Sequence, residues 1–202
     1  MSKLSKNLVF LNENVPKYRI IGLQGGTRSG KTYSAVQWAI RFCHKYSGVT
    51  ISICRDTFNA LKATTMRDFF DLLNEAGVYN QKNYNATDHI YFLNGNYIEF
   101  FGLDSPGKVQ GRKRDILIVD EALSTGDAKF KEKSLNRIKE LRSDDRALIL
   151  VSHAMATLRD VCNDVAWLHK GTLVQRGAPD ATIDAYQEFL QVGKSAAIDE
   201  DV

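Results

Sequence analysis

The feature that most constrains this chain is an eight-residue segment in which three glycines accompany a Lys-Thr pair. It fits the pattern G-x-x-x-x-G-K-[ST] and reads, in order, Gly25, Gly26, Thr27, Arg28, Ser29, Gly30, Lys31 and Thr32. The largely apolar residues from Tyr18 to Gln24 predict a short buried strand before it, and residues 33–46 predict a helix after it. A strand, a glycine loop and a helix in this order predict backbone N–H groups that turn inward around phosphate oxygens.

The residue types in this segment suit a nucleoside triphosphate with Mg²⁺. Glycines allow the tight backbone path, and a helix that begins near Gly30 offers its positive end to an anion. Lys31 can reach the β- and γ-phosphates, and the hydroxyl of Thr32 is a ligand for Mg²⁺. Arg28 has two open roles, because it either neutralises charge that develops on the phosphates or faces water. The sequence therefore predicts that residues 25–32 bind the phosphates of a nucleoside triphosphate. We expect this nucleotide to be ATP, although the motif contains no residue that specifies the base.

A pair of acids predicts the second half of such a site. The aliphatic run from Ile116 to Val119 is typical of a strand buried on both faces, and Asp120 and Glu121 follow it directly. Ligands of open α/β sheets bind beyond the carboxyl ends of the strands. We therefore expect Asp120 to hold Mg²⁺ together with Thr32, and Glu121 to orient the attacking water.

The next buried strand, predicted over Ala147 to Val151, ends at Ser152 and His153. In folds of this class we expect this strand to lie between the two strands already described. That position would direct His153 to the γ-phosphate as a sensor, whereas a lone histidine is otherwise a structural residue. Beyond nucleotide-bound Mg²⁺, no metal site is predicted.

The rest of the chain alternates between strands and helices. A strand is expected over residues 49–54, and the further helices are expected over 57–76, 128–142, 155–162 and 179–191. Two hairpins are expected, one around Asn94-Gly95-Asn96 and one around Lys170-Gly171. We predict a single three-layer α/β domain of the P-loop NTPase type over residues 1–192, RecA/ABC-like, with a mostly parallel sheet, helices on both faces and a β-hairpin insertion. A flexible acidic tail is expected over residues 193–202.

Composition and charge exclude other classes and suggest a compartment. The 202 residues contain 14 Gly, 3 Pro and 3 Cys, which excludes collagen, low-complexity and disulfide-rich proteins. No apolar run approaches the roughly 18 residues of a membrane span, and no secretory signal is visible, so we expect a cytoplasmic protein. Residues 1–120 carry 16 basic and 10 acidic side chains, whereas residues 121–202 carry 11 and 14. A basic loop could contact nucleic-acid phosphates or be solvated; it contains Lys108, Arg112, Lys113 and Arg114.

Residues 1–119 resemble the ATPase part of the phage terminase large subunit, the motor that packages DNA into phage heads. Besides the glycine loop, the resemblance rests on Cys54-Arg-Asp-Thr57, on the Asn-Gly hairpin that leads to Phe101-Gly-Leu-Asp104, and on Val109-Gln-Gly-Arg112. It implies ATP hydrolysis with Mg²⁺, with double-stranded DNA and phage packaging components as partners.

Residues from about 115 to 190 instead resemble the end of an ABC-type ATPase of the polysaccharide or teichoic acid export type. The matching segments are Val119 to Asp127, Phe130 to Ser134, Leu150 to His153, Trp167 to Gly171 and Gly177 to Asp180. The resemblance implies that Glu121 is the catalytic carboxylate, that residues 124–127 lie at a dimer interface and that His153 is a switch histidine. It also implies a membrane permease as partner.

Each resemblance has a departure, so three hypotheses stay open. The stretch from Leu103 to Arg112 lacks the Ser-Gly-Gly signature of ABC ATPases. A terminase usually continues into a nuclease domain, and the 82 residues given after Asp120 are few for one, so we do not expect DNA cleavage. The main hypothesis is a DNA-packaging ATPase, and the second is the ATP-binding subunit of an exporter. The third is a natural or engineered chimera that binds nucleotide without turnover. A homo-oligomer is compatible with all three.

Overall fold

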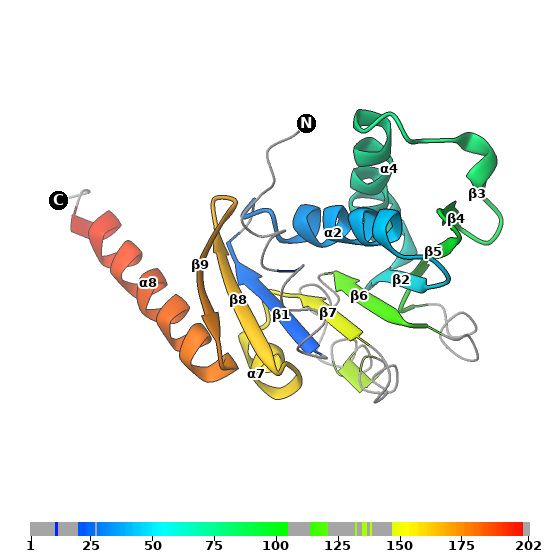
Figure 1. Ribbon diagram of the computed structural model, residues 1–202. Coiled ribbons are helices and arrows are strands. Elements are labelled where there is room, and N and C mark those ends of the chain that lie inside the picture. Colours follow the sequence, from blue (N-terminus) through cyan, green and yellow to red (C-terminus); the bar gives the residue numbers. More distant parts are fainter. Residues whose placement is uncertain are drawn as a thin grey trace.

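The computed structural model describes residues 11, 20–26, 28–104, 114–120, 132, 135, 136, 138 and 147–199, with side chains in the last segment described to residue 193. Its centre is a nine-stranded sheet in the order β3-β4-β5-β2-β6-β7-β1-β8-β9 (Figure 1). The strands are β1 (Ile20–Gly25), β2 (Thr50–Arg55), β3 (Tyr84–Asn85), β4 (Ile90–Leu93), β5 (Asn96–Gly102), β6 (Ile116–Asp120), β7 (Ala147–Val151), β8 (Asp164–His169) and β9 (Thr172–Gly177).

Most of the sheet is parallel. The six central strands, from β5 to β8 in spatial order, pair in parallel, and the antiparallel pairs are confined to the two edges. At one edge β4 pairs with β5 and β3, and at the other β9 pairs with β8. Since the carboxyl ends of parallel strands meet at one edge, β1, β2, β6 and β7 all deliver the residues that follow them to the same region.

Helices cover both faces of the sheet. They are α2 (Lys31–Lys45), α3 (Phe58–Ala63), α4 (Thr65–Glu75), α7 (Met155–Val161) and α8 (Pro179–Asp199), with a short 3₁₀ helix η1 (Gln81–Asn83). One core cluster joins the sheet to α2, α3 and α4, and a second joins it to α7 and α8. Figure 1 shows α2 and α4 on the opposite side of the sheet from α7. The predicted three-layer α/β fold is confirmed.

The strand β6 shows why the sheet needs helices on both sides. Its residues alternate between the two core clusters, because successive side chains of a strand point to opposite faces. Ile116 and Ile118 belong to the cluster under α2 and α4, whereas Leu117 and Val119 belong to the cluster under α7. All four side chains are at most 4% exposed, so the continuous aliphatic run in the sequence reflects burial on both faces.

Both predicted hairpins are confirmed, and their turns have the expected backbone. Asn94 and Gly95 have φ values of 51° and 74°, and Lys170 and Gly171 have values of 47° and 76°. Two consecutive positive φ values are the signature of the tight turns that match the twist of antiparallel strands.

The prediction of one helix over residues 57–76 is wrong in one respect, because the structure has two helices there. Thr64 separates α3 from α4, because its φ of −126° and ψ of −92° are not helical. The Thr64 hydroxyl donates to the carbonyl oxygen of Ala60 at 2.8 Å, a local contact that competes with the helical hydrogen-bond pattern. The amphipathic spacing of the apolar residues continues across the break and therefore concealed it.

The last helix extends further than the expected range of 179–191. It continues to Asp199, through a stretch whose alanines favour helix. Much of the helix expected over 128–142 lies outside the described residues, although Glu132, Leu135, Asn136 and Ile138 are helical. Within the part of the chain that the structure describes, no helix combines the length and the apolar character that a membrane crossing requires.

Candidate nucleotide-binding site

The glycine loop connects β1 to α2 and is shaped by two glycines. Gly30 has a φ of 84° and precedes the first residue of α2, so the chain enters the helix through a left-handed residue. At Gly25 a Cβ atom would lie 2.1 Å from the carbonyl oxygen of Leu168 in β8. Only glycine fits there, because the loop passes directly against the backbone of a neighbouring strand. Thr27, between them, lies outside the described residues.

The side chain of Lys31 is folded into this loop. Its ammonium Nζ donates to the carbonyl oxygens of Gly25 and Gly26, both at 2.9 Å, and to Oγ of Ser29 at 3.2 Å. Lys31 is 5% exposed, so a positive charge is held in the interior of the loop. These three oxygens are uncharged, and a buried cation among such partners suits the binding of an anion.

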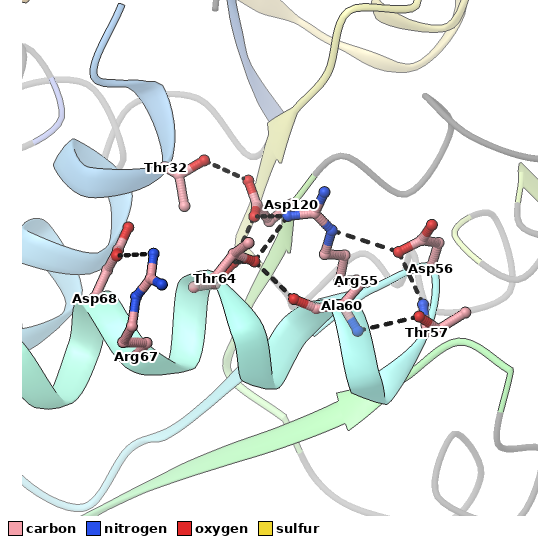
Figure 2. Close-up of polar contacts among 10 residues, drawn as sticks. Thr32, Arg55, Asp56, Thr57, Ala60, Thr64, Arg67, Asp68 and Asp120 are labelled. Carbon is pink, nitrogen blue, oxygen red and sulfur yellow. Dashed lines mark hydrogen bonds and ion pairs between the residues drawn. The ribbon is translucent and has the colours of Figure 1, made fainter. Parts of the chain in front are cut away.

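The hydroxyl of Thr32 and the carboxylate of Asp120 are brought together, as predicted for a Mg²⁺ site. Thr32 Oγ1 donates to Asp120 Oδ1 at 2.7 Å, across 88 positions of sequence (Figure 2). Thr32 lies in the first turn of α2, and Asp120 is the last residue of β6 and is fully buried. That these two residues ligate the metal stays a prediction.

The other oxygen of Asp120 has partners that the sequence analysis missed. Thr65 donates to Asp120 Oδ2 at 2.5 Å, and the Arg55 guanidinium lies 3.5 Å from the same oxygen. Arg55 also donates to the hydroxyl of Thr64 at 2.8 Å, so the break between α3 and α4 faces the acid (Figure 2). Arg55 could have been found from the rule that located Asp120, because it too ends a buried parallel strand.

The strand β7 lies between β6 and β1, as predicted. Ser152 follows it and is fully buried, and its N–H donates to the carbonyl oxygen of Leu23 in β1 at 3.3 Å. Its hydroxyl accepts from the N–H of Ala154 at 3.0 Å, just before α7 begins. His153 is half-buried at this end of the sheet. Its role as a sensor of the γ-phosphate stays a prediction.

The remaining candidates differ in what the structure says of them. Arg28 is exposed, with a φ of 62° that non-glycine residues seldom adopt, and its role at the phosphates stays a prediction. Glu121 lies outside the described residues, as do the basic-loop residues Lys108, Arg112 and Lys113.

Arg114 is the one residue of the basic loop that the structure describes, and it is not available to nucleic acid. It is 4% exposed, and its Nε donates to Glu99 at 2.6 Å. Its guanidinium also lies 5.0 Å from the centre of the Phe101 ring. A buried carboxylate thus fixes this cation inside the fold, and the spacing of charges in the sequence could not reveal it.

The donor set of the site fits Mg²⁺ that arrives with a nucleotide. Mg²⁺ is commonly held by one or two carboxylates together with substrate phosphates, and it retains waters. Asp120 and Thr32 supply one carboxylate and one hydroxyl. Within the described ranges, no cluster of three His, Cys, Asp or Glu residues could hold a metal without such a ligand.

Comparison with solved structures supports the fold assignment. The structure resembles that of the large terminase from a thermophilic bacteriophage with a TM-score of 0.58 and 19% identity, covering 92% of this chain and 50% of the terminase chain. The same terminase in complex with ADP matches with a TM-score of 0.53 and 21% identity over 74% of this chain and 39% of that chain.

Curated relatives match a shorter part of the chain. The teichoic acids export ATP-binding protein TagH of Levilactobacillus brevis is 41% identical over 77 residues, which are 38% of this chain and 21% of the relative. TagH of Staphylococcus saprophyticus is also 41% identical, over 76 residues that are 38% of this chain and 29% of the relative. The chain thus spans less than a third of either relative.

A family model spans both parts of the chain that the sequence resemblances distinguish. The model of the terminase large subunit, T4likevirus-type, N-terminal, matches residues 23–192, from within β1 to within α8. This range includes the glycine loop, Asp120 and His153 and covers more than half of the chain. The chain belongs to the family of T4-like-virus-type terminase large subunit N-terminal domains.

Proposed function

We propose that the chain binds ATP with Mg²⁺ and hydrolyses it to ADP and phosphate. The observation that carries this proposal is the contact between Thr32 and Asp120, at the helix start where the preceding residue, Lys31, holds its ammonium buried in the glycine loop. A hydroxyl, a carboxylate and a lysine arranged in this way suit the binding of a metal–triphosphate complex. Membership of the terminase family and the structure of the bacteriophage terminase with ADP support the choice of nucleotide.

Each residue has a distinct task in the proposed reaction. The backbone of residues 25–32 and Lys31 bind the β- and γ-phosphates, while Thr32 and Asp120 hold the metal. Bound Mg²⁺ neutralises charge on the phosphate oxygens. Glu121 orients the attacking water, His153 senses the γ-phosphate, and Arg28 stabilises charge that develops during transfer.

As partners we propose double-stranded DNA and the components of a phage packaging machine, in the cytoplasm and as part of a homo-oligomer. The family and the terminase structures support this choice over others. Proteins bind DNA largely by neutralising its backbone phosphates, and this attraction weakens as salt rises. DNA should therefore stimulate the release of phosphate from ATP at low salt and lose this effect at high salt. No DNA effect at any salt concentration would argue against the packaging assignment.

The second candidate is the ATP-binding subunit of an exporter that docks on a membrane permease. It is favoured by the 41% identity to TagH proteins over 77 residues. This candidate predicts ATP-driven dimers, detectable by sedimentation with the Glu121→Gln variant. The absence of a Ser-Gly-Gly signature between residues 103 and 112 weighs against it.

The decisive experiment measures MgATP binding by calorimetry and phosphate release by a coupled assay. Lys31→Ala should abolish tight binding, whereas Glu121→Gln should retain binding and lose turnover. Lys45→Ala is the matched control, because Lys45 is an exposed lysine at the other end of α2. Wild-type protein that binds MgATP without releasing phosphate would favour a binding protein, and equal turnover by wild type and Glu121→Gln would contradict the assigned role.

A further inference from the structure

The break between α3 and α4 places a hydroxyl on the acid of the proposed metal site. Thr65 is the first residue of α4, is fully buried and donates to Oδ2 of Asp120 at 2.5 Å. The non-helical backbone of Thr64 changes the direction of the chain after α3. In a helix that continued unbroken from Phe58, Thr65 would lie elsewhere. The break at Thr64, which the apolar pattern did not predict, thus places Thr65 in contact with Asp120.

The two oxygens of Asp120 are used differently. Oδ1 accepts from Thr32, at the start of the helix that follows the phosphate loop. Oδ2 accepts from Thr65 and lies 3.5 Å from Arg55, both on the side of the break. Arg55 is itself held by Thr64 at 2.8 Å (Figure 2). One oxygen therefore faces the nucleotide-binding elements, and the other is anchored to α4 and β2.

A carboxylate rotates easily about its last side-chain bond unless neighbouring groups fix it. Donors on Oδ2 fix the plane of the Asp120 carboxylate and so determine where Oδ1 lies. Partners of this kind behind a metal ligand orient it, and their loss typically weakens metal binding by roughly 10- to 100-fold.

We propose that Thr65 and Arg55 are positioning residues of the metal site, which hold Asp120 so that Oδ1 is presented beside Thr32. The inference rests on the proposed function, since it assigns these residues to the site that would bind Mg²⁺ with a nucleotide. Thr65 makes the shorter contact, at 2.5 Å against 3.5 Å, and carries the larger share of the effect.

The test compares ADP binding by calorimetry with Mg²⁺ and with EDTA, which isolates the contribution of the metal. Thr65→Val keeps the shape of the side chain and removes the hydroxyl. It should lower the Mg²⁺-dependent gain in ADP affinity by about tenfold and leave binding in EDTA unchanged. Thr65→Ser should restore the gain, and Arg55→Gln should reduce it by a smaller factor. Mn²⁺ titration followed by electron paramagnetic resonance should show the same order.

Thr182→Val is the matched control. Thr182 in α8 is also fully buried, and its hydroxyl has no hydrogen-bond partner among the described residues, so the same substitution removes no contact. Its Mg²⁺ dependence should equal that of the wild type.

Several results would overturn the inference. Wild-type protein that binds neither ADP nor MgADP would overturn the proposed function together with it. Metal-dependent binding by wild type with an unaffected Thr65→Val would overturn this inference alone, and so would a failure of Thr65→Ser to restore the gain. Should Thr65→Val not fold, Arg55→Gln decides, because unchanged Mg²⁺ dependence in that variant would then reject the positioning role.

Discussion

The segments before and after residue 120 contribute different parts of one sheet. In the described chain, residues 20–120 supply β1 to β6 and the helices α2, α3 and α4, which pack on one face. Residues 147–199 supply β7, β8 and β9 and the helices α7 and α8, which pack on the other. If the two segments were separate units, each would have its own contiguous strands. Instead β1 lies between β7 and β8.

Because strands of the two segments alternate in the sheet, the boundary between the two sequence resemblances is not a boundary in the fold. The phosphate loop follows β1, and both strands that pair with β1 come from the later segment. Even the loop itself contacts that segment, since the N–H of Gly171 donates to the carbonyl oxygen of Ser29 at 3.2 Å. We expect the nucleotide site to depend on both segments.

The largest effect is expected when the two segments are separated. Residues 1–119 alone would leave both edges of β1 without their partners and much of the second core cluster exposed. We expect this fragment to show no cooperative unfolding transition in urea, followed by circular dichroism, whereas the full chain shows one. A cooperative transition in the fragment would contradict the dependence of one segment on the other, because the first segment would then fold on its own.

The next largest effect is expected at the contact between the phosphate loop and β8. Gly25→Ala places a Cβ atom 2.1 Å from the Leu168 carbonyl oxygen, which belongs to backbone that cannot move aside easily. We expect a loss of about 4 kcal/mol in the free energy of unfolding, measured in urea without nucleotide. Gly26→Ala is the control, since a Cβ there meets nothing within 4 Å. Equal stabilities of the two variants would show that the loop does not rely on β8.

A third effect is expected within the earlier segment, at the buried ion pair of Arg114 and Glu99. Arg114→Met leaves the Glu99 carboxylate buried without its cation, and we expect a loss of about 3 kcal/mol in the free energy of unfolding. The double variant Arg114→Met/Glu99→Leu should recover most of the lost free energy of unfolding, because a buried ion pair can be replaced by apolar side chains. A double variant no more stable than Arg114→Met would contradict this account.

The smallest effect is expected at the ion pairs of the later segment. Arg159 in α7 contacts Asp180 and Asp184 of α8, and both carboxylates are exposed. These contacts raise the pKa of Arg159, chiefly through the hydrogen bond with Asp184. We expect Arg159→Met to shift the melting temperature less than Arg114→Met does, and the shift to shrink at high salt because surface pairs are screened. A shift that is independent of salt would show a packing role instead.

Features set by local chemistry could be predicted from the sequence. The glycine loop, both hairpins and the strand before Asp120 each depend on a few adjacent residues with marked backbone or burial preferences. The juxtaposition of Thr32 and Asp120 followed from the rule that parallel strands end at one edge of the sheet. That reasoning required only the type of sheet and no side-chain detail.

Features set by tertiary partners could not be predicted. The polar contacts made at the helix break join separate elements, because Arg55 donates to Thr64 and Thr65 donates to Asp120. Arg114 has the sequence context of a solvated basic loop, but it is buried and donates to Glu99 on β5. In both cases a polar group is placed by a partner distant in sequence, which periodicity does not reveal.

The position of β1 in the sheet also has a consequence for synthesis on the ribosome. β1 and its glycine loop leave the ribosome before β7 and β8, the strands that flank β1, and the strands β2 to β6 are translated in between. Pairing between strands that are far apart in sequence is slow, because the loop between them must close before their contacts form. The nascent chain would therefore lack a formed phosphate loop until β7 and β8 have emerged, so nucleotide capture would come late in translation.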